Sequence, residues 1–140
     1  MLSYQHGFHA GNRADVLKHA VLDLVLRDAA KGSRPLLYVE THSGRGRYDL
    51  TGAQARKGGE ADTGILDLLK QDALPGFEDW LKLVRERTER DYPGSPALAL
   101  ARLPASARAI LFERHPAEFK ALVEYLGADP RALIREADGY

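Results

Sequence analysis

The sequence predicts an α/β fold built on a parallel sheet, and three observations lead to that prediction. Short apolar runs typical of buried strands occur at residues 36–39, 107–112 and 132–134. Each run leads into an acidic residue, and these are Glu40, Glu113 and Asp138. Segments with helical spacing separate the runs, and strands that alternate with helices favour parallel pairing through right-handed crossovers.

Two helices are predicted beside these strands. Residues 14–30 carry apolar side chains at helical spacing, and Gly32 suits the end of that helix. Leu22 and Leu26 lie on the other side of this helix, so we expect it to be sandwiched between other elements. The second helix is expected to begin at His115-Pro116 and to run to about Leu126, with its apolar residues turned inward.

The segment between Gly46 and Ala97 has a different pattern. Residues 52–59 are polar and glycine-rich, which predicts a mobile loop. Residues 63–71 and 77–90 have helical spacing, and Trp80 is expected in the core of this part. We therefore interpret residues 47–92 as a helical insertion in the first crossover.

Composition sets outer limits on function. The chain of 140 residues has the length of about one domain and contains no cysteine, so it has no disulfides and no thiolate metal site. No apolar run reaches the roughly 20 residues of a membrane helix, which predicts a cytoplasmic protein without a membrane partner. The net charge is zero, but residues 1–58 hold 9 Lys/Arg against 5 Asp/Glu. A basic first half is compatible with a phosphate-binding face and equally with an ordinary solvated surface.

The turn after the first predicted strand carries the strongest local motif, Glu40-x-His42-x-Gly44-x-Gly46. Glycines at the carboxyl end of a strand let the backbone approach a ligand closely, and ligands of parallel sheets bind at that edge. The motif alone is also compatible with a plain tight turn.

The interpretation of this turn as a binding site depends on Glu113, at the end of the next strand. In nucleotide-binding sheets, an acid at this position accepts hydrogen bonds from ribose hydroxyls. Gly46 and Glu113 are 67 positions apart, beyond the usual ~20, and the insertion accounts for the excess. The alternative is a solvated acid, but three strand-end acids around one crevice favour a Rossmann-like binding site.

For the other candidate binding residues, a purely structural role is an alternative to a functional one. The pair His6 and His9 has helical spacing but too few further ligands nearby for a metal site, so we predict none. His19 on a partly apolar helix face is typical of a core histidine. The basic residues around the glycine turn suit either RNA phosphates or a solubilising loop.

Several stretches, in the same order along the whole chain, resemble one family. They are Met1–His19, residues 41–48, residues 92–96, residues 113–116 and residues 137–139. These motifs resemble the RlmJ family of 23S ribosomal RNA adenine-N6 methyltransferases, which use S-adenosylmethionine. The resemblance implies a Rossmann-like class I methyltransferase sheet formed by residues 1–46 and 93–140, with residues 47–92 as the insertion.

The resemblance also implies roles for individual residues. The cofactor-binding set comprises His19, His42, Gly44, Gly46, Ser95, Glu113, Asp138 and Gly139. Within it, Glu113 would hold the ribose, while Asp138 and Gly139 would lie at the adenine. Tyr4 and His6 would form a mobile N-terminal motif over the site with Lys18 close by, contacting the substrate, protein-free 23S rRNA.

The sequence departs from the family in one respect. Family members carry an Asp-Pro-Pro-Tyr segment whose Asp accepts hydrogen bonds from the target amine, and this sequence contains no Pro-Pro and ends at Tyr140. The catalytic residues are therefore unknown, and we expect a truncated chain that is inactive alone and has a first strand unpaired on one side. The alternative is a non-catalytic nucleotide- or RNA-binding module. A nicotinamide-dependent oxidoreductase is disfavoured because the turn lacks the third glycine.

Overall fold

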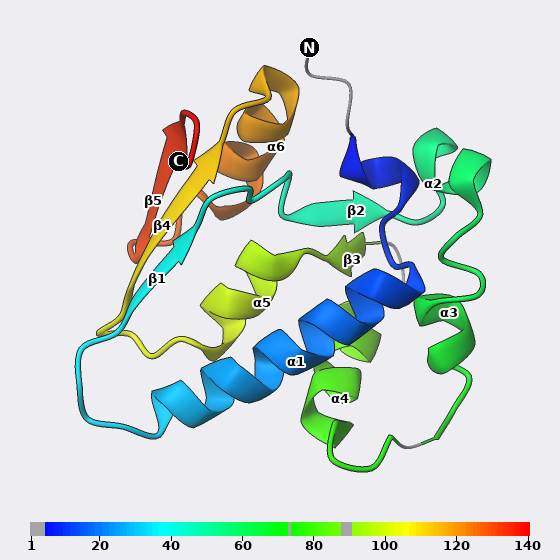
Figure 1. The fold of residues 1–140 in the computed structure, drawn as a ribbon, viewed down its shortest axis with the longest axis horizontal. Helices are drawn as coiled ribbons and strands as arrows, with labels where there is room; N and C mark the ends of the chain where they lie inside the picture. Colours follow the sequence, from blue (N-terminus) through cyan, green and yellow to red (C-terminus); the bar gives the residue numbers. More distant parts are fainter. Residues whose placement is uncertain (1–4, 73, 88–90) are drawn as a thin grey trace. The chain divides into compact units, whose positions relative to one another are not determined.

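The computed structural model describes residues 5–72, 74–87 and 91–140. The chain divides into two compact units (Figure 1). The N-terminal unit comprises residues 1–21 and 48–93, and the sheet unit comprises residues 22–47 and 94–140. The first 21 residues thus group with the predicted insertion, while the functional division at residues 47 and 92 stays a prediction.

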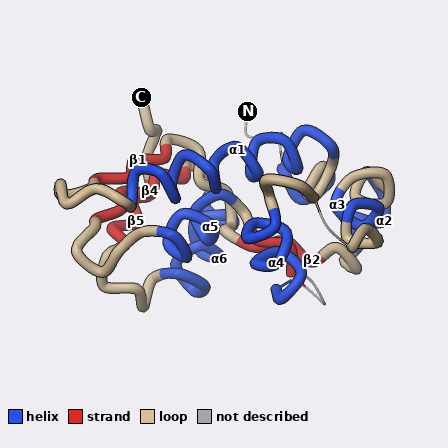
Figure 2. The backbone as a smooth tube through the Cα atoms, turned by 90° about the horizontal axis from the view of Figure 1, so that it is seen from below, coloured by secondary structure: helices blue, strands red, loops and turns tan. Residues whose placement is uncertain are grey.

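The sheet unit confirms the predicted α/β fold with a parallel sheet. Its strands are β1 (Leu37–Glu40), β4 (Arg108–Glu113) and β5 (Ala132–Glu136), in the order β1-β4-β5. Both neighbouring pairs are parallel, with Val39 opposite Ile110 and Ile110 opposite Leu133. The helices of this unit are α5 (Ser95–Arg102), α6 (Pro116–Leu126) and the second half of α1 (Arg13–Ala30). Figure 2 shows the three strands side by side.

One face of this sheet is covered and the other is open. The buried core consists of Leu26, Ala99, Leu100, Leu103, Ala107, Ala109, Leu111 and Leu122. On β1, by contrast, Leu37 is 63% exposed and Val39 is 51% exposed. The predicted burial of this strand is therefore wrong. β1 lies at the edge of the described sheet and pairs only with β4 there, which agrees with the expectation that one side of the first strand is unpaired.

The N-terminal unit combines short helices with a two-stranded sheet. It contains η1 (His6–Phe8), the first half of α1, α2 (Ala53–Gly58), α3 (Ile65–Leu68) and α4 (Glu78–Arg87). Strands β2 (Arg47–Asp49) and β3 (Asp91–Pro93) pair with each other. Ile65, Trp80, Val84 and Tyr92 are fully buried, which confirms Trp80 as a core residue.

Two local predictions need correction, and a third is tested only in part. The predicted loop at residues 52–59 contains α2, which ends at Gly59 with a φ of 64°. The helix expected at residues 63–71 shortens to the four residues of α3. The last three residues of the helix expected at 77–90 lie outside the described residues, and α4 ends at Arg87.

The expectation that α1 is sandwiched is also wrong. Leu17 is 66% exposed and Val25 is 59% exposed, whereas Asp15 and Asp23 are almost completely buried. The helix buries a polar face instead of two apolar ones, because the buried polar side chains have polar partners. The Asp23 carboxylate, for example, pairs with the guanidinium of Arg102 at 2.5 Å. None of the helices in the described part of the chain has the length and apolarity needed to cross a membrane.

The covered face of the sheet predicts a difference between two leucines. Leu122 is fully buried, so Leu122→Ala should lower the free energy of unfolding by about 2–5 kcal/mol, since it leaves a cavity. Leu133 is 45% exposed, and Leu133→Ala should cost less than about 1 kcal/mol. Urea denaturation followed by circular dichroism measures both. Equal losses would contradict the assignment of the covered face.

Candidate functional site

The carboxyl ends of the three parallel strands meet at one edge of the sheet unit. Glu40 lies opposite Leu111 on β4, and Glu113 lies opposite Glu136 on β5. The sequence predicted that the third strand ends at Asp138. In the structure β5 ends at Glu136, so Asp138 follows the strand by two residues. This edge is where parallel sheets bind their ligands.

The glycine turn is joined to β4 at this edge. The backbone N–H of Gly44 donates to Glu113 Oε2 at 2.8 Å, and the N–H of Ser43 donates to the Phe112 carbonyl at 2.9 Å. Gly44 has a φ of 62° and Gly46 a φ of 80°, a left-handed conformation that favours glycine. The structure therefore brings Gly44 and Glu113 together.

Glu113 holds two backbone segments with one carboxylate. Oε1 accepts the N–H of His115 at 2.7 Å, while Oε2 accepts from Gly44. A carboxylate has about four acceptor positions, so these two bonds leave Glu113 able to accept from ribose hydroxyls.

Gly46 connects the turn to the start of α5. Its carbonyl accepts the N–H of Gly94 at 2.9 Å. A Cβ at Gly46 would lie 3.0 Å from Leu122 Cδ1 and 3.2 Å from Tyr125 Cδ1, so the turn packs tightly on α6. The turn is thus fixed from two sides.

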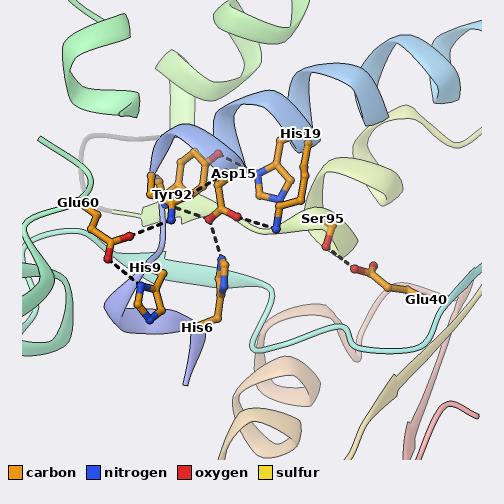
Figure 3. Close-up of polar contacts among 11 residues, drawn as sticks. His6, His9, Asp15, His19, Glu40, Glu60, Tyr92 and Ser95 are labelled. Carbon is orange, nitrogen blue, oxygen red and sulfur yellow. Dashed lines mark hydrogen bonds and ion pairs between the residues drawn. The ribbon is translucent and has the colours of Figure 1, made fainter. Parts of the chain in front are cut away.

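Ser95 is the first residue of α5, as predicted, and its hydroxyl donates to the Glu40 carboxylate (Figure 3). The Tyr38 hydroxyl donates to Glu40 Oε2 at 2.9 Å, and burial together with the charge of Glu40 raises the pKa of Tyr38 well above its usual value. Because the only hydroxyl hydrogen of Ser95 goes to Glu40, Ser95 Oγ can serve a further group only as an acceptor.

The segment after β5 approaches the end of β1. A Cβ at Gly139 would lie 2.4 Å from the Thr41 carbonyl oxygen, a distance that only glycine permits. The rings of His42 and Tyr140 are in edge contact, with centroids 5.2 Å apart. Asp138 pairs with Arg114 at 2.9 Å.

An apolar pocket lies in the same unit. Its lining consists of Ile110, Phe112, Phe119, Leu133, Ile134, Arg135, Glu136 and Ala137. The pocket thus reaches the neighbour of Asp138 and offers apolar surface beside the polar edge.

In the N-terminal unit, the polar groups gather around Asp15, which is 1% exposed (Figure 3). His6 Nε2 lies 2.6 Å from Oδ2, and Lys18 Nζ lies 3.0 Å from Oδ1. Burial acts to raise the pKa of Asp15, but the hydrogen bond and charge of His6, with His19 and Lys18, outweigh it and lower the pKa to about 2. Asp15 is therefore a carboxylate at neutral pH.

His19 bonds to Tyr92, a residue that sequence reasoning did not single out. His19 Nδ1 lies 2.8 Å from the Tyr92 hydroxyl, and His19 is 5% exposed. Burial lowers the pKa of His19 to about 4, against an opposing effect from the charge of Asp15. His19 is thus neutral at physiological pH.

The N-terminal segment is tied to the rest of its unit. Asn12 Nδ2 and His9 Nδ1 each lie 2.8 Å from the Glu60 carboxylate, and these two contacts lower the pKa of Glu60. The side chains of Gln5 and Gln54 are 2.6 Å apart. These contacts anchor residues 5–12 in this structure, the expected mobility of the N-terminal motif stays a prediction, and Tyr4 lies outside the described residues.

The predicted site residues thus form two groups, one in each unit. His42, Gly44, Gly46, Ser95, Glu113, Asp138 and Gly139 lie at the carboxyl edge in the sheet unit. His6, Lys18 and His19 surround Asp15 in the N-terminal unit. The spacing Asn12-x-x-Asp15, typical of a helix start, was the signal that could have identified Asp15.

The buried His19 predicts a pH dependence of stability. Its pKa is about 4 in the folded chain and about 6.5 when unfolded, so the unfolded chain takes up a proton first as the pH falls. Stability should decrease by roughly 3 kcal/mol between pH 6.5 and 4 from this group alone. His19→Gln keeps a partner for Tyr92 and should lose less stability over that range in urea denaturation. Parallel pH curves for both proteins would contradict burial of a neutral His19.

Comparison with known proteins gives consistent matches. A family model described as ribosomal RNA large subunit methyltransferase D, RlmJ, matches residues 33–140. Proteins named ribosomal RNA large subunit methyltransferase J from Escherichia coli K12 and Haemophilus influenzae are 40% and 38% identical to the chain. Each alignment covers 100% of this chain and 52% of the relative, so the chain spans about half the length of the curated relatives it matches.

A solved structure agrees with these matches. The crystal structure of a Legionella pneumophila protein superposes with a TM-score of 0.82 at 32% identity, covering 94% of this chain and 50% of that one. The match of the family model to residues 33–140 includes the glycine turn, Ser95, Glu113 and Asp138. The chain therefore belongs to the RlmJ family of ribosomal RNA large subunit methyltransferases.

Proposed function

We propose that this chain supplies the cofactor-binding part of a methyltransferase that methylates an adenine N6 amine in 23S rRNA, with S-adenosylmethionine as the methyl donor. The observation that carries the proposal is the Gly44–Glu113 hydrogen bond, which joins the glycine turn to an acid at the carboxyl edge. Membership of the family supports the transfer of a methyl group to ribosomal RNA. Since the proposed substrate is ribosomal RNA, we place the protein in the cytoplasm in this proposal.

The residues at the carboxyl edge fit the chemical groups of S-adenosylmethionine. Glu113 retains acceptor positions for the ribose hydroxyls, and Ser95 Oγ is an acceptor suited to the ammonium group. The N–H groups of Ser95 and Ala97 at the start of α5 favour the carboxylate, and Pro96 between them has no N–H. When bound, the cofactor supplies an electrophilic methyl group on sulfonium.

The remaining cofactor-binding residues complete this arrangement in the proposal. Asp138 and Gly139 adjoin the apolar pocket that ends at Ala137, which suits the flat adenine ring. Gly44 and Gly46 adopt the left-handed backbone conformation that shapes the turn, with His42 beside them. The family resemblance also assigns His19, in the N-terminal unit, to the cofactor-binding set, and residues 47–92 to the insertion.

The N-terminal unit supplies the proposed RNA contacts. Lys18 is 63% exposed at its side chain, so its ammonium can meet an RNA phosphate. His6 lies beside it on the same carboxylate, and its ring is in edge contact with the ring of Tyr48 at 5.1 Å. Tyr4 completes the predicted substrate-binding set.

A substitution of Glu113 tests the cofactor proposal. Glu113→Gln removes the charge that favours ribose hydroxyls as donors and should weaken binding of S-adenosylhomocysteine about tenfold or more, measured by calorimetric titration. Glu124→Gln is the matched control, because the same change at a 66% exposed side chain on α6 should leave binding unchanged. Equal affinities for all three proteins would contradict the ribose assignment.

An exchange of halves tests the reaction. We expect that the E. coli relative, with its matching half replaced by this chain, transfers tritium from labelled S-adenosylmethionine to protein-free 23S rRNA. Nucleoside analysis should then identify N6-methyladenosine, with the unmodified relative as control. A different methylated nucleoside would contradict the adenine-N6 proposal. Cofactor binding without any methyl transfer is the result that a non-catalytic binding module predicts.

A further inference from the structure

Asp15 is the one fully buried carboxylate that contacts proposed RNA-binding side chains in the described part of the chain. Its Oδ2 lies 2.6 Å from His6 Nε2 and accepts the N–H of Gly11 at 3.1 Å. Its Oδ1 lies 3.0 Å from Lys18 Nζ. Three groups from η1, the following turn and α1 therefore depend on two oxygen atoms (Figure 3).

We propose that Asp15 is a positioning residue for RNA recognition. Its carboxylate contacts both the His6 ring and the Lys18 ammonium and so fixes the position of each relative to the other. The inference rests on the proposed contact of His6 and Lys18 with ribosomal RNA. Asp15 itself, at 1% exposed, acts through these two side chains and does not touch the RNA.

The role of Asp15 at the start of α1 does not account for these contacts. Asn12 Oδ1 accepts the N–H of Asp15 at 2.9 Å, and Asp15 accepts the N–H of Gly11, which together satisfy the helix start. The hydrogen bond to His6 and the ion pair with Lys18 are additional to these. They bring two chemically different recognition groups, an imidazole and an ammonium, to the same carboxylate.

The charge of Asp15 determines how His6 is held. An ionised carboxylate only accepts hydrogen bonds, so Nε2 of His6 must carry a hydrogen whatever the charge of the ring. When the ring is neutral, its lone pair is on Nδ1. Asp15 thereby sets both the orientation of the ring and its hydrogen-bonding pattern, as a carboxylate does for many functional histidines.

The paired charge also limits the freedom of Lys18. A lysine side chain loses rotamer entropy when it is fixed, and the ion pair with Asp15 takes up part of that cost before RNA binds. Because the remaining side chain is 63% exposed, the ammonium stays accessible to a phosphate.

The first test is spectroscopic and needs no RNA. In ¹⁵N-labelled protein, the Nε2–H of His6 should give a downfield proton signal that exchanges slowly with water. The signal should be lost in Asp15→Asn and kept in Asp23→Asn. The control is matched, because Asp23 is equally buried on the same helix and pairs instead with Arg102. Absence of the signal in the wild type, or its survival in Asp15→Asn, would overturn the inference.

The second test measures affinity for a fluorescent single-stranded RNA oligonucleotide that contains adenine. Asp15→Asn should weaken binding roughly tenfold or more, while Asp23→Asn should not. In a double-mutant cycle, Asp15→Asn combined with His6→Gln should bind no more weakly than the weaker single variant, because both changes remove the same arrangement. Additive losses, or an equal loss in Asp23→Asn, would show a general structural effect and overturn the inference.

Two further outcomes separate this inference from the proposed function. If His6→Gln and Lys18→Gln leave RNA affinity unchanged, the proposed RNA contacts are wrong and the inference falls with them. If both weaken binding but Asp15→Asn does not, only the inference is wrong. If Asp15→Asn does not fold, two other measurements test the inference. They are the Nε2–H proton signal of His6 in the wild type and a double-mutant cycle of RNA affinity between His6→Gln and Lys18→Gln. Non-additive losses support a shared carboxylate and additive losses contradict it.

Discussion

The hydrogen bond between the Gly44 N–H and the Glu113 carboxylate is the constraint on which the candidate cofactor site depends. It joins residues that are 69 positions apart, and it fixes the glycine turn after β1 against the end of β4. Parallel pairing of β1 with β4 brings both residues to the same edge, since parallel strands have their carboxyl ends together. The left-handed backbone at Gly44 then redirects the chain into the turn that leads to Gly46. Strand order, turn and acid thus form one geometric unit.

The same edge shows why three strand-end acids do not have one role. Glu40 accepts from Ser95 and Tyr38, so its carboxylate orients neighbouring side chains. Glu113 accepts from backbone N–H groups, and Asp138 forms an ion pair with Arg114 at a 49% exposed side chain. The sequence pattern of acids after strands predicts where they gather. It does not predict which hydrogen-bond donors each of them meets.

Much of the fold could be predicted from local sequence, because strands and long helices have strong periodic signals. The three strands, α6 and the beginning of α5 at Ser95 agree with prediction. The segment at residues 52–59 was mispredicted, since the polar residues and glycines that suggested a loop form α2 with a glycine at its end. Tyr92 was missed as a site residue because its contact with His19 joins residues 73 positions apart, and no local pattern reports it.

The buried face of α1 is the clearest case in which hydrophobic periodicity failed for a physical reason. Asp15, His19 and Asp23 are spaced four residues apart and lie on one face of the helix. All three are almost completely buried, while the apolar Leu17, Val21 and Val25 are exposed. A buried polar face is stable only if each group has partners, and here these are His6 with Lys18, Tyr92, and Arg102. Because Tyr92 and Arg102 come from segments 73 and 79 positions away, these partners meet the helix face only in the folded chain. Its burial holds the proposed RNA-contacting side chains in a defined arrangement rather than adding to an apolar core.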